Sequence, residues 1–386
     1  MYNIYNLFNL GLTKRKNMVK YFKSIGSSWR LSFFERRCII RHHAERPGSV
    51  LNNKTFAAKK CAKGLVFLCP YAGNFGGLFF MMMYVLLIAG FVLLIKGADF
   101  FVDGASSVAK LLKIPSVIIG LTVAAMGTSA PEAAVSISAG FSGSSDIALS
   151  NVVGSNIFNL LIVVGVSAII CPVVSEKVIL TRDIWWSLGA SGVLLVMMLD
   201  MKISNIEGVL LLIGMVAYIL LLIRSAKKNR IEGDDIKAMS PFKSVLCIAG
   251  GLVAIIFGGD LVVDNAVLIA EAIGMSETFI GLTIVAAGTS LPELVTSIVA
   301  AKKGDSGLAL GNVVGSNIFN VLFILGSASA LTVINASNLL IIDTVILMGI
   351  TLVMYAFGKT GNKTTRFEGA LCIAMYAAYA AYITLR

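Results

Sequence analysis

The chain has 386 residues, of which 57% are hydrophobic and only 14% are charged, and its mean hydropathy is +0.87. This composition excludes an ordinary soluble globular protein and predicts a chain that crosses a membrane several times. Because an unpaired backbone amide is costly in hydrocarbon, we expect the membrane part to be helical throughout. The expected fold class is therefore an all-α polytopic membrane protein.

The formal net charge of +11 comes from the first 80 residues, which hold 14 Lys and Arg but only two acids, Glu35 and Glu45. Residues 81–386 hold 18 Lys and Arg against 19 Asp and Glu, so the membrane part offers no basic surface for nucleic acid. We expect residues 1–80 to be a basic extension that is disordered or non-native. The native start is then Met81, Met82 or Met83.

Ten apolar runs follow in chain order, although the second and third can also be read as one re-entrant unit. They are 83–98, 115–140, 147–170, 184–199, 207–223, 244–259, 278–301, 307–331, 339–357 and 367–385. Connections after the odd-numbered runs carry 15 Lys and Arg, whereas those after the even-numbered runs carry only Lys202. This asymmetry predicts that the odd connections are cytoplasmic and that both termini lie outside.

The membrane part contains an internal duplication. Residues 120–165 and 281–326 align without a gap, with 27 of 46 positions identical, and "NVVGSNIFN" is repeated completely at 151–159 and 312–320. We therefore expect two five-helix repeats, 81–223 and 244–386, joined by a polar cytoplasmic linker at 224–243. Because five is odd, the second repeat enters the membrane inverted, as in many secondary transporters.

Each repeat carries a proline followed by glutamate inside an apolar run, "GTSAPE" at 127–132 and "GTSLPE" at 288–293. Pro131 and Pro292 cannot donate to the carbonyl four residues earlier, so we expect both helices to be broken near mid-membrane with carbonyl oxygens exposed. Glu132 and Glu293 are costly at that depth and have no Lys or Arg in the core to pair with. A cation or a proton is the counter-charge that remains.

Further oxygen donors surround these glutamates in the sequence. Thr128, Ser129, Thr289 and Ser290 precede them by about one turn, while Ser155 with Asn159, and Ser316 with Asn320, share helix faces at i and i+4. Gly154 and Gly315 are interpreted as close-packing positions, and Asn151 and Asn312 as helix caps. The membrane part has no histidine, and the six cysteines lack metal-site spacing. Carboxylates, hydroxyls and amides are the donors that calcium prefers, and sodium uses the same oxygens.

The two motifs together, "GTSAPE…GSNIFN" and "GTSLPE…GSNIFN", resemble the paired alpha-repeats of the sodium/calcium exchanger family, within the cation/calcium exchanger superfamily. The resemblance covers nearly all of 83–386 and is to ten-span, prokaryotic-type members. It implies an antiporter that exchanges sodium for calcium by alternating access in the plasma (inner) membrane, with no cofactor. The implied ion ligands are Thr128, Ser129, Glu132, Ser155, Asn159, Thr289, Ser290, Glu293, Ser316, Asn320 and the carbonyls of Ala125 and Ala286.

Several alternatives stay open on the residues alone. A calcium/proton antiporter needs only the carboxylates, and a passive channel is compatible with broken helices. An intramembrane protease is disfavoured because "FGGD" at 257–260 only partly matches an aspartyl-protease motif and Ser129 and Ser290 lack a nearby base. We therefore expect no enzyme. Beyond the ions and the lipid bilayer no partner is indicated, and no motif points to an oligomeric state.

Two details refine these expectations. Some relatives carry Asp at the position of Asn320, where an acid accompanies potassium co-transport, so the resemblance argues against potassium dependence. Four repeated acids, Asp99, Asp103, Asp260 and Asp264, lie near the ends of the first and sixth runs. They are either interfacial carboxylates or groups that attract cations to the two mouths of the pathway.

Overall fold

The computed structural model describes residues 75–141, 145–228, 238–275 and 286–385. Within these ranges the first half comprises α4 (Phe75–Leu111), α5 (Ser116–Ile119), η1 (Gly120–Ala124), α6 (Ala125–Thr128), α7 (Ala130–Phe141), α8 (Ser145–Phe158), η2 (Asn159–Val163), α9 (Val164–Ile170), β1 (Val173–Val174), η3 (Ile179–Asp183), α10 (Ile184–Met197), η4 (Met198–Asp200), β2 (Lys202–Ile203) and α11 (Asn205–Lys228). The second half comprises α12 (Pro241–Ala272), α14 (Ala286–Thr289), α15 (Leu291–Lys302), α16 (Ser306–Phe319), η6 (Asn320–Leu325), α17 (Gly326–Leu331), β3 (Ile334–Asn335), α18 (Asn338–Gly361), β4 (Lys363–Thr364) and α19 (Arg366–Leu385).

The expectation of an all-helical membrane protein is confirmed. Among the described residues, eight helices are long and apolar enough to cross a membrane, and a ninth span is formed by two segments, 116–128 and 130–141, bent by 51°. The third apolar run is a span of its own, Ile147–Ile170, so a single re-entrant unit is not needed. The seventh predicted span begins outside the described residues, and α14 and α15 form the rest of it. The basic extension also lies outside them up to residue 74, and α4 already begins at Phe75.

Two short sheets show that the repeats are inverted. Strand β1 pairs antiparallel with β4, and β2 pairs antiparallel with β3. The helical span 179–200 separates β1 from β2, so the two sheets lie at its opposite ends. In the duplication, β1 is equivalent to β3 and β2 to β4, both at an offset of 161 residues. Equivalent segments therefore lie at opposite ends of the bundle.

Odd-numbered connections gather at the end that carries β1 and β4. The backbone N–H of Val174 donates to Ser306 Oγ at 3.2 Å, which joins the third and seventh connections. Asp305 accepts hydrogen bonds from Ser106 Oγ and Ser116 Oγ at 2.7 and 2.6 Å, which joins the seventh to the first. At the other end, Asn205 donates to the carbonyl of Ser329 at 3.1 Å. This sorting agrees with the predicted even and odd topology.

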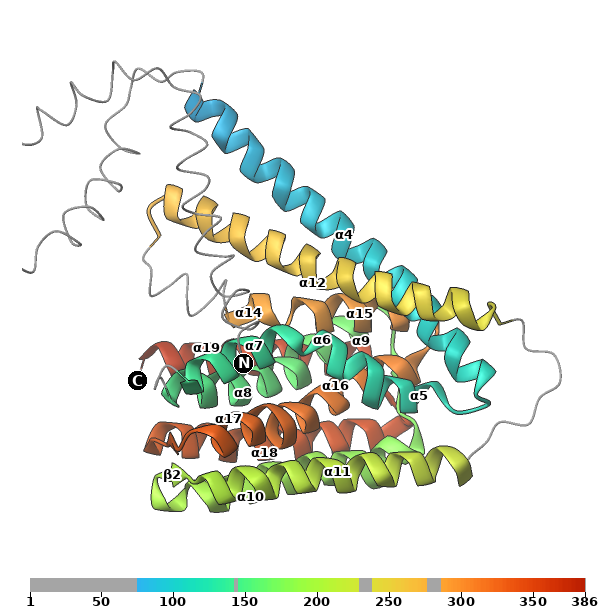
Figure 1. Ribbon diagram of the computed structural model, residues 1–386, viewed down its shortest axis with the longest axis vertical. Coiled ribbons are helices and arrows are strands. Elements are labelled where there is room, and N and C mark those ends of the chain that lie inside the picture. The colour runs from blue at the N-terminus through green and yellow to red at the C-terminus, as the bar shows by residue number, and fades with distance from the viewer. Residues whose placement is uncertain (1–74, 142–144, 229–237, 276–285, 386) are drawn as a thin grey trace, which may run out of the picture. The chain divides into compact units, whose positions relative to one another are not determined.

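Helices α4 and α12, the first helices of the two repeats, lie side by side and run antiparallel (Figure 1). Their contact is built on glycine. A Cβ added at Gly258 would lie 2.8 Å from the carbonyl oxygen of Gly90, and one added at Gly251 would lie 2.7 Å from that of Gly97. Glycines at seven-residue spacing thus allow the backbones to touch, as is common between membrane helices.

The innermost span is α16–η6–α17, in which every residue from Gly307 to Phe319 is buried. A Cβ at Gly315 would lie 2.7 Å from Leu121 Cα, so its predicted close-packing role is confirmed. Gly154 does not share that role, because an added Cβ there would meet nothing within 4 Å. The inverted repeat therefore does not make the packing identical around equivalent glycines.

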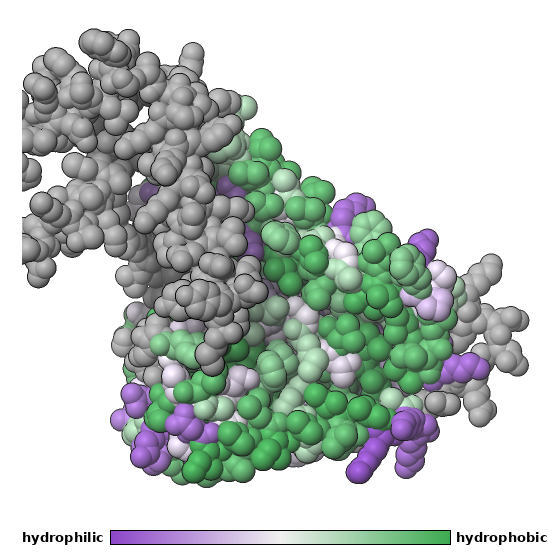
Figure 2. Space-filling model, viewed as in Figure 1, coloured by the Kyte–Doolittle hydropathy of each residue, from purple (hydrophilic) through white to green (hydrophobic). Residues whose placement is uncertain are grey.

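The outer helices present apolar side chains to the surroundings (Figure 2). Large exposed hydrophobic residues follow one face of α11 and α12, namely Leu210, Ile213, Val216, Leu220, Val253 and Phe257. Figure 2 shows hydrophobic residues over the middle of this face and hydrophilic ones gathered toward the helix ends. Such a band fits a chain whose solvent is lipid.

We predict that Gly258→Ala weakens the contact between α4 and α12. The added methyl group would meet backbone atoms of Leu94 and Gly90 at 2.7 and 2.8 Å, and overpacking of this kind costs about 1–3 kcal/mol. The measurement is the melting temperature of the detergent-purified protein. Gly250→Ala on the same helix is the control, because its Cβ would meet nothing within 4 Å. Equal melting temperatures for the two variants would contradict the prediction.

Candidate ion-binding site

The predicted helix breaks are present in both repeats and fall at the same residue. Helix α6 ends at Thr128 and α7 begins at Ala130, with Ser129 between them at φ −80° and ψ 12°. Ser290 separates α14 from α15 at φ −92° and ψ 8°. Proline two residues later has no N–H, so the carbonyl four residues before it lacks its helical donor. After each break a new helix begins two residues before the glutamate.

Glu132 and Glu293 lie in the first turns of α7 and α15, and both side chains are 0% exposed. The first turn of a helix carries the positive end of its dipole, which favours a carboxylate. The restarted helices thus supply some electrostatic stabilisation to each acid without supplying a full counter-charge.

Reciprocal hydrogen bonds link each glutamate to a serine of the other repeat. Ser129 Oγ donates to Glu293 Oε1 at 2.8 Å, and Ser290 Oγ donates to Glu132 Oε1 at 2.9 Å. Each serine therefore serves the glutamate of the other repeat. The second oxygen of each carboxylate, Oε2, is buried and has no hydrogen-bond partner among the described residues.

A third buried acid shows how differently this fold treats a structural carboxylate. Asp183 is also 0% exposed, but Arg182 pairs with both of its oxygens at 2.8 and 2.9 Å and Tyr218 donates to it at 3.1 Å. In the described part of the chain, no ion pair of this kind reaches Glu132 or Glu293. No third Asp, Glu, His or Cys among the described residues joins them in a metal-ligating group.

Hydroxyl and amide oxygens predicted for the site are buried as well. Ser155, Asn159, Ser316 and Asn320 are at most 4% exposed. Within the described ranges, Asn159 Oδ1, Ser316 Oγ and Asn320 Oδ1 are buried without a hydrogen-bond partner. Asn159 and Asn320 are also the first residues of π-helical segments η2 and η6, a geometry often found at functional sites. The sequence offers no signal for these π-helical turns.

Other predicted oxygens already have protein partners. The Thr128 hydroxyl lies 3.1 Å from the carbonyl of Ala124 and 3.2 Å from Asn312 Oδ1. The carbonyl of Ala125 accepts the N–H of Ser129 at 3.1 Å, which leaves it a second lone pair. Thr289 and Ala286 lie on α14, in the equivalent segment.

The expectation that Asn151 and Asn312 cap helices is wrong. Both lie inside their helices, and Asp305 is the residue that caps α16. Asn151 Nδ2 donates to the carbonyl of Glu132 and to Ser136 Oγ, at 3.3 and 2.9 Å. Asn312 makes the equivalent bonds to Glu293 and Ser297. These asparagines therefore hold the glutamate-bearing helices in place.

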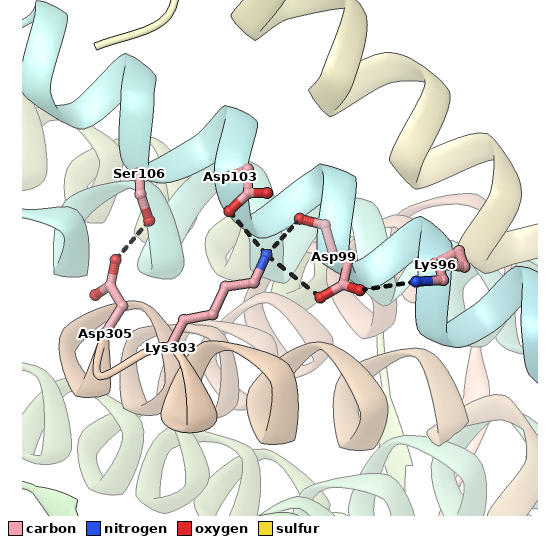
Figure 3. Close-up of polar contacts among 6 residues, drawn as sticks. All are labelled: Lys96, Asp99, Asp103, Ser106, Lys303 and Asp305. Carbon is pink, nitrogen blue, oxygen red and sulfur yellow. Dashed lines mark hydrogen bonds and ion pairs between the residues drawn. The ribbon is translucent and has the colours of Figure 1, made fainter. Parts of the chain in front are cut away.

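At one end of the bundle, the acids of α4 are paired with a lysine (Figure 3). Lys303 Nζ lies 2.7 Å from Asp103 Oδ1 and 3.3 Å from Asp99 Oδ1, and it donates to the carbonyl of Asp99 at 2.9 Å. The equivalent acids of α12, Asp260 and Asp264, are exposed and form no ion pair with another described residue. The two mouths expected for the pathway are thus electrostatically different.

An open cavity of about 600 Å³ lies beside this lysine, and Asp103, Lys110, Glu176 and Asp305 are among its lining residues. Burial raises the pKa of Glu176, and the neighbouring carboxylates of Asp305 and Asp183 raise it further.

The fold and the site together define a polytopic membrane protein whose two inverted halves share one buried, oxygen-rich centre. The sequence profile of the family described as "Sodium/calcium exchanger protein" matches residues 82–224 and 243–385, one match in each half. The chain belongs to this family, and it is therefore a transporter and not an enzyme.

Individual relatives agree with this assignment. The sodium/calcium exchanger MaX1 of Methanosarcina acetivorans is 33% identical over 344 residues, covering 77% of this chain and 97% of that protein. Inner membrane protein YrbG of Escherichia coli is 35% identical over 257 residues, covering 64% of this chain and 79% of its own length. A structure of the sodium-calcium exchanger NCX_Mj, soaked with 2.5 mM Na+ and 0.1 mM Sr2+, is 34% identical with a TM-score of 0.70 and covers 78% of this chain and 99% of its own.

We predict that Lys303→Gln makes the end of the bundle near α4 more attractive to cations. The change removes the ammonium that pairs with Asp99 and Asp103 and so raises the negative charge at this end by one, and charged mouths raise the local concentration of counter-ions. The apparent KM for calcium at low ionic strength is expected to fall about two- to tenfold. The difference should shrink at 0.15 M salt, where the Debye length is about 8 Å.

The control for this prediction is Lys302→Gln, which removes the same charge from the neighbouring exposed residue. Calcium uptake into proteoliposomes at two salt concentrations gives both KM values. An equal effect of the two variants would exclude a specific role for the ion pair with Asp99 and Asp103.

Proposed function

We propose that this transporter is a secondary active antiporter that exchanges sodium for calcium across the membrane by alternating access. The observation that carries the proposal is the pair Glu132 and Glu293. These carboxylates come from the two inverted halves, are fully buried, and each keeps one oxygen without a protein partner. Among the described residues no cationic side chain pairs with these two carboxylates. Their two negative charges can therefore balance one divalent ion.

The oxygen donors around the glutamates support calcium as that ion. Calcium takes six to eight oxygen ligands in flexible geometry. Besides both carboxylates, the unpartnered buried oxygens of Asn159, Ser316 and Asn320 are available. The hydroxyls and carbonyls inferred from the family resemblance extend this set. No thiol or imidazole of the described residues joins this set in a metal-ligating group, so softer metals are not favoured.

Sodium and calcium transport are coupled because both ions use the same two carboxylates. Sodium ions that occupy overlapping oxygens compete with calcium for Glu132 and Glu293, so the site holds one kind of cargo at a time. The neutral amide at Asn320 argues against a further potassium requirement. Relatives whose names describe sodium/calcium exchange support this choice of counter-ion for the present chain.

The helix pair α4 and α12 is the part of the fold that we expect to move during alternating access. Helices α4 and α12 contact each other through glycine backbones, and their outer faces are exposed. We infer that this pair slides as a unit against the other helices and exposes the site to each side in turn. Positive charge on the odd connections supports an orientation with both termini outside, in the inner membrane of a prokaryote.

The alternative is a calcium/proton antiporter, in which protons neutralise the glutamates in the return step. Calcium-45 uptake into proteoliposomes separates the two, because sodium, potassium and proton gradients can be imposed one at a time. We expect a sodium gradient to drive uptake and a pH gradient alone to drive little. Uptake as fast with the pH gradient as with sodium would overturn sodium exchange.

Neutralising either glutamate is the direct test of the site. In Glu132→Gln and in Glu293→Gln only one glutamate remains, so one positive charge of a bound divalent ion is unbalanced. Breaking a buried charge pair in this way costs about 3–5 kcal/mol. Sodium-driven calcium uptake is therefore expected to fall by at least about a hundredfold. Asp183→Asn is the matched control, because that carboxylate is paired within the protein. Calcium exchange retained in both glutamine variants would refute the site.

A further inference from the structure

Two buried asparagines outside the predicted ligand set face each other across the repeats. Asn156 and Asn317 are each 1% exposed and lie one residue after Ser155 and Ser316. Asn156 Nδ2 donates to the backbone carbonyl of Asn317 at 3.1 Å, and Asn317 Nδ2 donates to that of Asn156 at 3.0 Å. The two halves are thus joined by a reciprocal pair of hydrogen bonds.

These bonds determine which way each amide group points. A backbone carbonyl can only accept, so the atom facing it must be Nδ2 in both asparagines. The oxygens Oδ1 of Asn156 and Asn317 consequently point to the other side and can only accept. Any group beside them must offer an N–H or an O–H.

The groups beside them are the two site asparagines. Asn159 Nδ2 donates to Asn317 Oδ1 at 3.1 Å, and Asn320 Nδ2 donates to Asn156 Oδ1 at 3.0 Å. Their nitrogens are used in this way, and their own oxygens are left buried without a partner. A rotated amide would instead present N–H groups where a cation needs an oxygen.

We propose that Asn156 and Asn317 are positioning residues that turn the amide oxygens of Asn320 and Asn159 toward the transported cation. This inference rests on the proposed cation site. Each positioning residue acts across the repeats, Asn317 on Asn159 and Asn156 on Asn320. The arrangement also selects an amide at 159 and 320, because an ionised carboxylate there would face Asn317 Oδ1 or Asn156 Oδ1, acceptor against acceptor.

The first test replaces the positioning amide by an apolar group of similar size, in Asn317→Leu and Asn156→Leu, with Asn317→Ala as a smaller second variant. Loss of a residue that orients a ligand typically weakens metal affinity about 10–100-fold. We expect this loss in the KM for calcium uptake and in the calcium-induced rise of the melting temperature. The maximal uptake rate should change less.

Asn265→Leu is the control, because Asn265 is also buried but, among the described residues, donates only to the carbonyl of Leu261 on its own helix. A merely structural role would lower the melting temperature without calcium and leave the calcium concentration for half-maximal stabilisation unchanged. That result in folded Asn317→Leu, Asn156→Leu and Asn317→Ala would overturn the inference.

Double substitutions test the crossed connection. If Asn317 acts through Asn159, then Asn159→Leu combined with Asn317→Leu should bind calcium no more weakly than Asn159→Leu alone. Combining Asn317→Leu with Asn320→Leu should instead multiply the two losses. Multiplied losses in both combinations would refute the crossed positioning. Absence of sodium-driven calcium uptake in the unsubstituted protein would refute the proposed function itself, whatever the asparagine variants do.

Discussion

The arrangement of both repeats depends on two fully buried carboxylates, Glu132 and Glu293, with which no cationic side chain among the described residues forms an ion pair. An isolated charge at that depth is costly, and the fold reduces the cost only in part. Ser129 and Ser290 each satisfy one oxygen, and the first turns of α7 and α15 add a favourable dipole. In the proposed function a transported cation balances the remaining charge, and a cation that binds only the folded protein also stabilises it.

Because the two repeats are equivalent and inverted, a contact from the first repeat to the second has an equivalent contact from the second repeat to the first. The bonds from Ser129 to Glu293 and from Ser290 to Glu132 are related by the 161-residue offset, as are the pairs β1–β4 and β2–β3. Because the two inverted halves contribute equivalent residues, the site itself is not directed toward one side of the membrane. The ends of the bundle differ instead, since Lys303 has no cationic counterpart at position 142, where the first repeat carries serine.

Much of this site could be predicted from residue types and spacing. Proline in an apolar run predicts a helix break because it lacks an N–H, and two copies of Thr-Ser-x-Pro-Glu predict a paired carboxylate centre. Asn156 and Asn317 were not predicted, although both lie in the completely repeated "NVVGSNIFN". Their role depends on which carbonyl of the other half each amide meets, and local sequence does not encode that contact.

The sequence by itself determined the membrane class, the inverted repeats and the two broken helices. Those features follow from composition, from an odd number of spans and from proline chemistry, which act along the chain. Only the tertiary structure decided that each serine donates to the glutamate of the opposite repeat, that Asn151 and Asn312 brace helices, and that Lys303 pairs with Asp99 and Asp103. These contacts join segments about 160 to 200 residues apart, or neighbouring helices 19 residues apart in sequence, so packing geometry sets them.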